Sequence, residues 1–322
     1  MIYTVTLNPS LDYTMRLGKI AHGEVNRARQ VAITFGGKGI NVSVMLTELG
    51  IESCALGFVA GFTGDEIISL LGARGVATDF IKVGKDGSSA SRINLKLAEE
   101  DTSNQSSTTE INASGPDISD GDIQRLYSKL DLVKEGDTVV LAGNIPPSCP
   151  SDIYRRIMER LTGRGVRFAV DATGKALEEC LAYKPFLIKP NIHELEELPS
   201  INRRLSCDAD VIDAARTLQS IGAVNVLVTL GGNGAILLDE HGKVHRQSAL
   251  SYLDIDPSAR LNTVGAGDSS VAGFLCGAEM MKKDPSLGYD HCLRLACAAG
   301  GATAYTDGIA RSDAVKSLLS LA

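Results

Sequence analysis

TVVLA, at residues 138–142, opens the stretch of sequence that decides the fold. A helical pattern follows at residues 152–161, and a second largely apolar run, RFAVD, occupies residues 167–171. Apolar runs separated by a helix are typical of parallel strands that are buried on both faces of a sheet. The same rhythm continues at residues 186–188 and 226–230. We therefore predict the α/β class, with a doubly wound, mostly parallel sheet flanked by helices.

Two segments depart from this rhythm. Residues 12–34 have small or polar residues where a core strand would have Val or Ile, and residues 89–113 contain the alternating run RINLKL. Alternation indicates a strand with one face in solvent. We expect these segments to pair into a small antiparallel sheet that stands off the main domain as a lid. Residues 1–322 would then form a single α/β domain that carries this lid.

The composition excludes several classes of protein. The 322 residues include 32 Lys and Arg against 39 Asp and Glu, and a chain of net charge −7 lacks the basic face that nucleic acid requires. No apolar run approaches the roughly 18 residues of a membrane span, and the first residues indicate a strand rather than a signal peptide. The seven cysteines include no Cys-x-x-Cys pair, which favours free thiols. We expect a cytoplasmic protein with no nucleic-acid or membrane partner.

The strongest local signal is NTVGAGDS at residues 262–269, directly before a helical pattern. Gly265 and Gly267 let the backbone turn so that free N–H groups converge at the helix start, where the helix dipole adds positive charge. Such a cradle can stabilise a transferring phosphoryl group, with Asp268 beside it. Alternatively, Asp268 only caps the helix. The stretch matches neither a Walker A loop nor a dinucleotide-binding fingerprint.

Two further glycine clusters follow expected strands. Residues 36–41, GGKGIN, open another helical pattern, where the glycines allow close approach to a ligand and Lys38 offers a charge for a phosphate. The alternative is a plain turn. Residues 231–234, GGNG, follow an apolar strand and form either part of a ligand site or an ordinary hairpin.

Carboxylates supply two more candidate sites. Asn191 and Glu194 stand three residues apart at a helix start, where they could hold the waters of a magnesium ion. The pattern alone favours the other interpretation, a capping box. Asp12 could bind ligand hydroxyls or simply form a turn. His241 and His245 lie in a polar hairpin-like stretch, where we expect no metal site.

Together these segments resemble the ribokinase-like sugar kinases of the phosphofructokinase B family, over nearly the whole chain and in the family's order. The motifs that carry the resemblance are TLNPSLD at residues 6–12, FGGKGIN at 35–41, NIHE at 191–194 and TVGAGD at 263–268. Within the family, the chain is similar to the bacterial 1-phosphofructokinases at Asn26-Arg27, Arg92-Ile93-Asn94, Thr109 to Asn112 and Gly115-Pro116. Tagatose-6-phosphate kinases are similar at most of these positions and are the alternative. Asn144 is a departure, because relatives usually carry Ser there.

The resemblance implies transfer of the ATP γ-phosphoryl group to the 6-hydroxyl of fructose 1-phosphate. Asp268 would be the general base, the backbone of Gly265, Ala266 and Gly267 the anion hole, and Asn191 and Glu194 would place Mg²⁺ through waters. It assigns substrate binding to Asp12, Arg27, Gly37, Lys38, Asn41, Arg92, Asn94, Glu110 and Asn144. It assigns ATP binding to Lys189, Asn191, Thr229, Gly231, Gly234, Thr263, Ala298 and Gly301.

Two expectations concern partners and the class of function. The solvent face of the lid could pair with the lid of a second subunit to form a homodimer. A non-catalytic sugar-phosphate sensor is the alternative from another class. Such a sensor would not need Asp268, Glu194 and the anion hole together, whereas this chain has all three.

Overall fold

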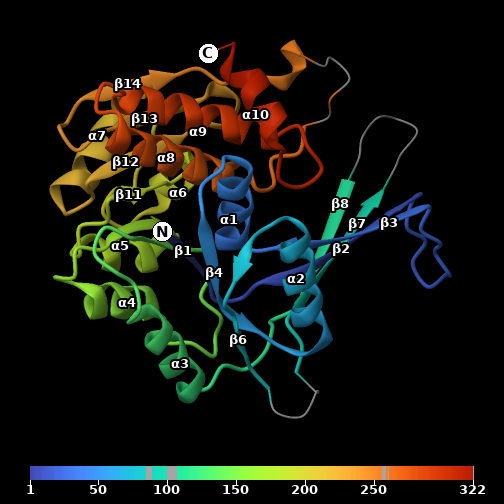
Figure 1. Ribbon diagram of the computed structural model, residues 1–322. Helices are drawn as coiled ribbons and strands as arrows, with labels where there is room; N and C mark the ends of the chain where they lie inside the picture. Colours follow the sequence, from blue (N-terminus) through green and yellow to red (C-terminus); the bar gives the residue numbers. More distant parts are fainter. Residues whose placement is uncertain (85–88, 100–106, 256–258, 260, 322) are drawn as a thin grey trace.

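A computed structural model describes residues 1–84, 89–99, 107–255, 259 and 261–321, and two β-sheets organise the chain (Figure 1). The larger sheet has the strand order β14-β13-β12-β11-β10-β9-β1-β4-β5, and β6 pairs with β4 beside this path. Its strands are β1 (Ile2–Thr6), β4 (Ser53–Val59), β5 (Ala77–Thr78), β6 (Ile81–Lys82), β9 (Thr138–Ala142), β10 (Arg167–Asp171), β11 (Leu187–Ile188), β12 (Asn225–Thr229), β13 (Ala235–Leu238) and β14 (Val244–Gln247). All pairs are parallel except β12 with β13 and β13 with β14. The predicted mostly parallel sheet is confirmed.

The apolar runs are strands that bury both faces, as the pattern predicts. In β9, Val139 and Leu141 belong to one hydrophobic core, and Val140 and Ala142 belong to a second core on the opposite face. Alternate side chains of a strand point to opposite faces, so a strand covered on both sides needs apolar residues throughout. This double burial explains why TVVLA contains almost no polar residue.

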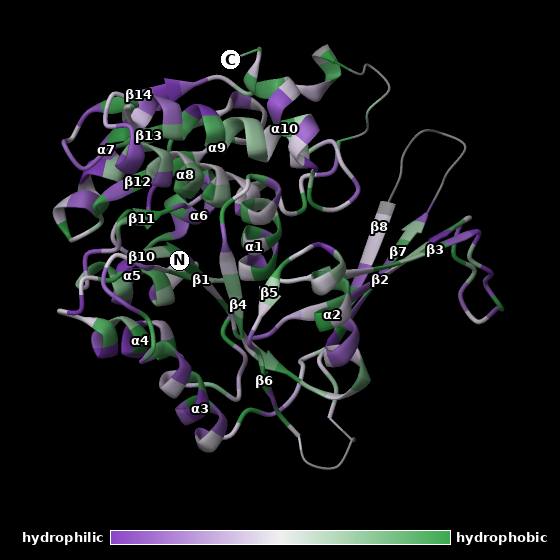
Figure 2. Ribbon diagram, in the orientation of Figure 1, coloured by the Kyte–Doolittle hydropathy of each residue, from purple (hydrophilic) through white to green (hydrophobic). Residues whose placement is uncertain are grey.

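Helices cover both faces of the larger sheet. The helices are α1 (Lys38–Glu48), α2 (Gly61–Ala73), α3 (Asp120–Leu130), α4 (Ile153–Leu161), α5 (Gly174–Leu181), α6 (Ile192–Glu197), α7 (Asp208–Ser220), α8 (Ala266–Lys283), α9 (Tyr289–Thr303) and α10 (Ser312–Leu319). Residues of α3 to α7 share one core, whereas residues of α1, α2, α8, α9 and α10 share the other. Hydrophilic and hydrophobic residues alternate along α3 and α4, as expected of helices with one buried face (Figure 2).

The small residues of α8 and α9 let these two helices pack closely. A Cβ atom added at Gly273 would lie 2.4 Å from the carbonyl oxygen of Leu295, so the position has no room for a side chain. Both helices are largely buried, as the Ala- and Gly-rich sequence predicts. No helix in the described part of the chain is long and apolar enough to cross a bilayer.

The smaller sheet projects from the larger one, as Figure 1 shows. Its order is β3-β2-β7-β8, with β2 (Ser10–Leu17), β3 (Gln30–Gly36), β7 (Arg92–Glu99) and β8 (Ser107–Asn112). The predicted pairing of the two segments is confirmed, but the expectation of a purely antiparallel sheet is wrong. The central strands β2 and β7 are parallel, with Ser10 opposite Arg92, because both enter the small sheet from the end nearest the main domain.

Candidate active site

A cavity of about 810 Å³ lies where the parallel strands end. Its wall includes Thr6 at the end of β1, Ala142 at the end of β9 and Thr229 at the end of β12. Helices α1 and α8 begin at the same edge, and their first residues also line the cavity. In open parallel sheets, ligands bind beyond the carboxyl ends of the strands.

The start of α8 presents free backbone N–H groups to this cavity. Gly265 occupies the N-cap position with φ 81°, a left-handed conformation that residues with a side chain rarely adopt. No acceptor for the N–H groups of Gly265, Gly267 or Asp268 is found among the described residues, whereas Ala266 donates to the carbonyl of Thr263 over 3.2 Å. The helix start can therefore bind an anion.

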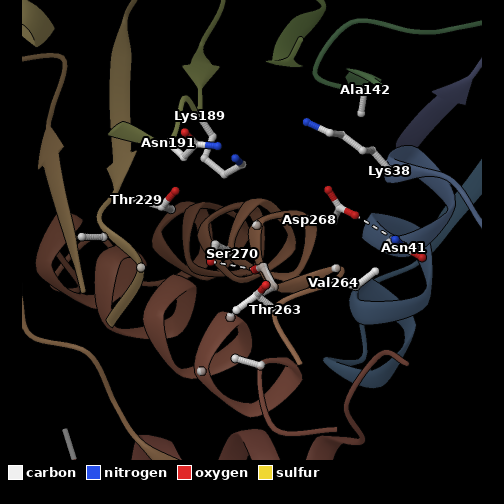
Figure 3. A pocket seen from close by; sticks show the side chains of 18 of the residues that line it. Lys38, Asn41, Ala142, Lys189, Asn191, Thr229, Thr263, Val264, Asp268 and Ser270 are labelled. Atoms are coloured by element: carbon white, nitrogen blue, oxygen red, sulfur yellow. Dashed lines mark hydrogen bonds between the residues drawn. The ribbon is translucent and has the colours of Figure 1, made fainter. Parts of the chain in front are cut away.

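Asp268 lies in the first turn of α8 but does not cap it, which removes the simpler interpretation of this residue. Its Oδ2 accepts a hydrogen bond of 2.8 Å from Nδ2 of Asn41 in α1 (Figure 3). Burial, followed by the negative charge of Asp171, raises the pKa of Asp268 to about 7. A carboxylate with this pKa can accept a proton near neutral pH, as a general base must.

Asp171 connects two lysines beside this carboxylate. Its side chain is 1% exposed at the end of β10, and its Oδ1 lies 3.2 Å from Nζ of Lys38 and 3.3 Å from Nζ of Lys189. Figure 3 shows the two lysines reaching into the cavity from different sides. Burial opposes the charge of Lys38, but Asp171, Asp268 and Glu194 outweigh it and raise the pKa of Lys38.

The start of α6 forms the capping box that its pattern predicts. The N–H of Glu194 donates to Oδ1 of Asn191, and Oε2 of Glu194 accepts from the N–H of Asn191, each over 2.9 Å. The other carboxylate oxygen, Oε1, lies 3.8 Å from Nζ of Lys38. Glu194 therefore caps its helix and still contributes charge to the cavity that it lines.

Arg92 is the cation where the small sheet meets the cavity. Its Nε donates to the main-chain oxygen of Asn8 over 3.1 Å, and Nδ2 of Asn8 donates to the carbonyl of Ser114. Burial lowers the pKa of Arg92, and the charge of Asp12 offsets part of that effect. No carboxylate among the described residues forms an ion pair with Arg92, so the guanidinium can bind an added anion.

Comparison with known proteins places the chain in a family. The family model described as pfkB family carbohydrate kinase matches residues 5–314. The chain belongs to this family. It is 38% identical over 319 residues to a 1-phosphofructokinase of Bacillus subtilis, with 99% of this chain and 97% of the relative covered.

Two further proteins extend the comparison for this pfkB-family kinase. It is 32% identical over 309 residues to a D-tagatose-1-phosphate kinase of Bacillus licheniformis, covering 96% of this chain and 94% of the relative. An Arabidopsis thaliana ribokinase complexed with ribose and ATP has the same fold, with a TM-score of 0.75 at 20% identity over 99% of this chain and 98% of the other. The predicted family and ribokinase-like fold are confirmed, and the protein is an ATP-dependent sugar kinase.

Most of the residues predicted for the site line the cavity of this pfkB-family kinase. They are Gly37, Lys38, Asn41, Arg92, Asn144, Lys189, Asn191, Glu194, Thr229, Gly231, Gly234, Thr263, Gly265, Ala266, Gly267, Asp268 and Gly301. Segments from seven regions of the sequence meet here, and most of them follow strand ends or begin helices at one edge of the larger sheet.

Five predicted residues do not line the cavity. Ala298 is fully buried in the core, because the face of α9 that borders the cavity consists of Cys297, Gly300, Gly301 and Ala304. This helical spacing turns Ala298 away, which removes it from the candidate nucleotide-binding residues. Arg27 is exposed on the segment between β2 and β3, and Glu110 is exposed on β8 of the small sheet.

Asp12 and Asn94, the other two, are buried on the small sheet beside the cavity. Oδ1 of Asp12 accepts from Oγ of Ser10 over 2.6 Å and from Nδ2 of Asn94 over 3.0 Å. Its Oδ2 lies 2.9 Å from Nζ of Lys96. Asp12 is therefore neither a turn residue nor an unpartnered carboxylate.

Sequence reasoning missed two charged residues of this region, Asp171 and Lys96. A signal for Asp171 was present, because it is the acidic residue that ends the apolar run RFAVD at the carboxyl edge of the sheet. Lys96 offers a weaker signal, since it shares the alternating face of β7 with Arg92 and Asn94.

Proposed function

We propose that this kinase transfers the γ-phosphoryl group of ATP to the 6-hydroxyl of fructose 1-phosphate, giving fructose 1,6-bisphosphate. The observation that carries the proposal is Arg92, a half-buried cation at the cavity without a carboxylate partner among the described residues. A buried cation is costly unless it is paired, so the site favours a substrate that already carries a phosphate. The name of the Bacillus subtilis relative supports the same substrate.

The start of α8 would carry out the transfer. Asp268 would accept the proton of the attacking hydroxyl, which its raised pKa allows near pH 7. The free N–H groups of Gly265 and Gly267 would bind the oxygens of the transferring group, where negative charge accumulates. Phosphoryl transfer depends mainly on such positioning and charge stabilisation.

The donor set fits a magnesium ion that is held through water. Glu194 keeps one carboxylate oxygen free of the capping box, and Asn191 also lines the cavity. Mg²⁺ keeps several waters and takes few protein carboxylates, so one carboxylate and one amide are enough to place it. Mg²⁺ would neutralise phosphate charge while Lys38 and Lys189 bind phosphate oxygens.

The small sheet would close over the sugar as a lid and also join two subunits. Its polar face carries Asp12 and Asn94, whereas Ile33, Ile93 and Ile111 lie on the opposite face, where they are 46%, 39% and 57% exposed. A contiguous apolar patch on a soluble protein marks an interaction surface. We propose that a second copy of the lid covers it in a homodimer.

Sedimentation velocity tests the dimer. Ile33→Lys combined with Ile111→Lys should convert the dimer to monomer, because two charges would have to be buried at the interface. Leu132→Lys is the matched control, since Leu132 is 71% exposed far from the small sheet. A wild-type protein that sediments as a monomer, or a double variant that still sediments as a dimer, contradicts the proposal.

A kinase assay across phosphorylated hexoses tests the activity. We expect ATP consumption with fructose 1-phosphate to exceed that with fructose 6-phosphate, tagatose 1-phosphate, tagatose 6-phosphate and fructose, and ³¹P NMR to place the product phosphates on C1 and C6. A tagatose phosphate that is phosphorylated faster would favour the tagatose alternative. Binding of sugar phosphate without ATP consumption would indicate a sensor.

The proposed location is the cytoplasm. The structure has seven free cysteines at positions 54, 149, 180, 207, 276, 292 and 297, which fits a reducing compartment.

A further inference from the structure

Asp171 lies between two lysines that line the cavity, Lys38 and Lys189. Lys38 comes from the start of α1, next to the segment that ends the small sheet, whereas Lys189 precedes α6 and lies close to the start of α8. A Cβ atom added at Gly267 would lie 3.2 Å from Nζ of Lys189. The two ammonium groups therefore reach the phosphoryl-transfer point from opposite sides, and one carboxylate oxygen contacts both.

The second oxygen of Asp171 is the unsatisfied part of this arrangement. Oδ2 is buried and has no hydrogen-bond partner among the described residues. An unpaired buried carboxylate oxygen is costly, and a purely structural residue would normally have its acceptors satisfied. Asp171 is therefore paired with both lysines through Oδ1, while Oδ2 keeps its capacity to accept a hydrogen bond.

We propose that Asp171 is a positioning residue that holds Lys38 and Lys189 at the transfer point and places a buried carboxylate among these lysines and Asp268. The inference rests on the proposed role of Asp268 as the base, but not on which sugar phosphate is the substrate. It deepens the proposed function by giving one residue two effects that can be measured separately.

The positioning effect follows from the ion pairs. Free lysine side chains sample many rotamers, and the ion pairs with Asp171 restrict both ammonium groups to one region of the cavity. When phosphates bind, the lysines are already within reach of them. Loss of Asp171 should therefore weaken binding of the sugar phosphate and of ATP together, because one lysine faces each substrate.

The effect on Asp268 follows from the charges around it. Among the described residues, the charged groups that shift the pKa of Asp268 are Asp171 on β10, which raises it, and Lys38 at α1 and Lys189 before α6, which lower it. The other polar contact is the neutral amide of Asn41 on α1. Removal of the Asp171 charge leaves both lysines in place, so the pKa of Asp268 should fall and the base should become weaker.

The test is a pH–rate profile of the full-length enzyme with ATP and whichever sugar phosphate the wild type phosphorylates. Asp171→Asn should move the acidic limb of kcat/KM to lower pH by about one unit. It should also raise KM for both substrates about tenfold. Asp171→Glu, which restores the charge, should return the limb toward the wild-type pH.

Two further measurements keep the inference falsifiable if Asp171→Asn folds poorly. Lys38→Met should move the acidic limb in the opposite direction, because Lys38 lowers the pKa of Asp268. The ¹³C carboxyl resonance that disappears in Asp268→Asn reports the titration of Asp268 directly and requires no turnover. An unchanged titration in Asp171→Asn, or a KM effect on only one substrate, overturns the proposal.

The outcomes also separate this inference from the proposed function. If Asp268→Asn keeps normal turnover, Asp268 is not the base and the proposed mechanism fails, whatever Asp171 does. If Asp268→Asn is inactive but Asp171→Asn changes only the melting temperature, the proposed mechanism stands and Asp171 has a structural role alone.

Discussion

Two charge clusters in this molecule differ in how completely they are paired. At the β13–β14 hairpin, His245 is 3% exposed and lies between two carboxylates, with Nε2 at 2.7 Å from Oδ2 of Asp239 and Nδ1 at 2.7 Å from Oδ1 of Asp290. Asp239 also accepts the N–H groups of His241 and Lys243. Each member of this hairpin cluster has a partner.

The charged residues of the cavity, Asp171, Asp268, Lys38, Lys189 and Arg92, form a second cluster, the cleft cluster, which is only partly paired. Among the described residues, Oδ2 of Asp171 has no hydrogen-bond partner and Arg92 forms no ion pair with a carboxylate, and burial together with the charge of Asp171 raises the pKa of Asp268 to about 7. In contrast, hydrogen bonds from His245 help to lower the pKa values of Asp239 and Asp290. Full pairing thus stabilises the fold, whereas incomplete pairing leaves room for phosphates and a proton.

The largest effect should come from Asp268→Asn. The amide cannot accept the proton, so kcat should fall by about 10²- to 10⁴-fold while the sugar phosphate still binds. A raised pKa means that the charged carboxylate costs stability above the ordinary pKa of 3.8, so the variant should melt no lower than wild type at pH 8. Steady-state kinetics and calorimetry check both; near-normal kcat would contradict the base role.

The corresponding change in the hairpin cluster should affect stability instead. His245→Ala leaves the buried Asp239 without its imidazole partner and should reduce the free energy of unfolding by about 3 kcal/mol. The kcat of the folded enzyme should be unchanged. His241→Ala, at an exposed position in the same hairpin, is the control and should change stability by less than about 0.5 kcal/mol. Urea denaturation measures the free energy of unfolding of both variants. Equal losses in His245→Ala and His241→Ala would show that the pairing of His245 does not stabilise the fold.

Arg92→Ala tests the unpaired cation of the cleft cluster. Loss of a charge-assisted contact to the substrate phosphate is worth about 1.5–3 kcal/mol, so kcat/KM for fructose 1-phosphate should fall about 10- to 100-fold. The kcat/KM for fructose, which has no phosphate, should change far less. Equal losses on the two sugars would show that Arg92 does not contact the phosphate.

The smallest expected effect is on the melting temperature at acid pH. Because the pKa values of Asp239 and Asp290 are lowered in the folded state, their stabilising contribution is present above the unfolded value near 3.9 and disappears as pH falls through the folded values. The difference in Tm between wild type and His245→Ala should therefore narrow below about pH 4. A constant difference from pH 7 to pH 3 would mean that these carboxylates do not sense His245.

Local patterns were enough to predict much of the fold and part of the site. The runs at 138–142 and 167–171 are β9 and β10 with the expected bounds, and the capping box of Asn191 and Glu194 forms as its spacing indicates. Burial on both faces and helix capping depend on neighbours in sequence, so the sequence records them directly. The parallel pairing of β2 with β7 depends on where two distant segments enter the small sheet.

The amino-acid sequence alone determined three features. These are the residue types that could bind phosphate and sugar, the glycine turn before α8, and the alternation of strands and helices. The tertiary structure decided which charges meet: that Asp171 lies between Lys38 and Lys189, that Arg92 has no carboxylate partner among the described residues, and that Ala298 faces the core. The reason is physical. Pairing and burial of a charge depend on distances between segments that lie far apart along the chain, and those distances exist only once the strands have packed side by side.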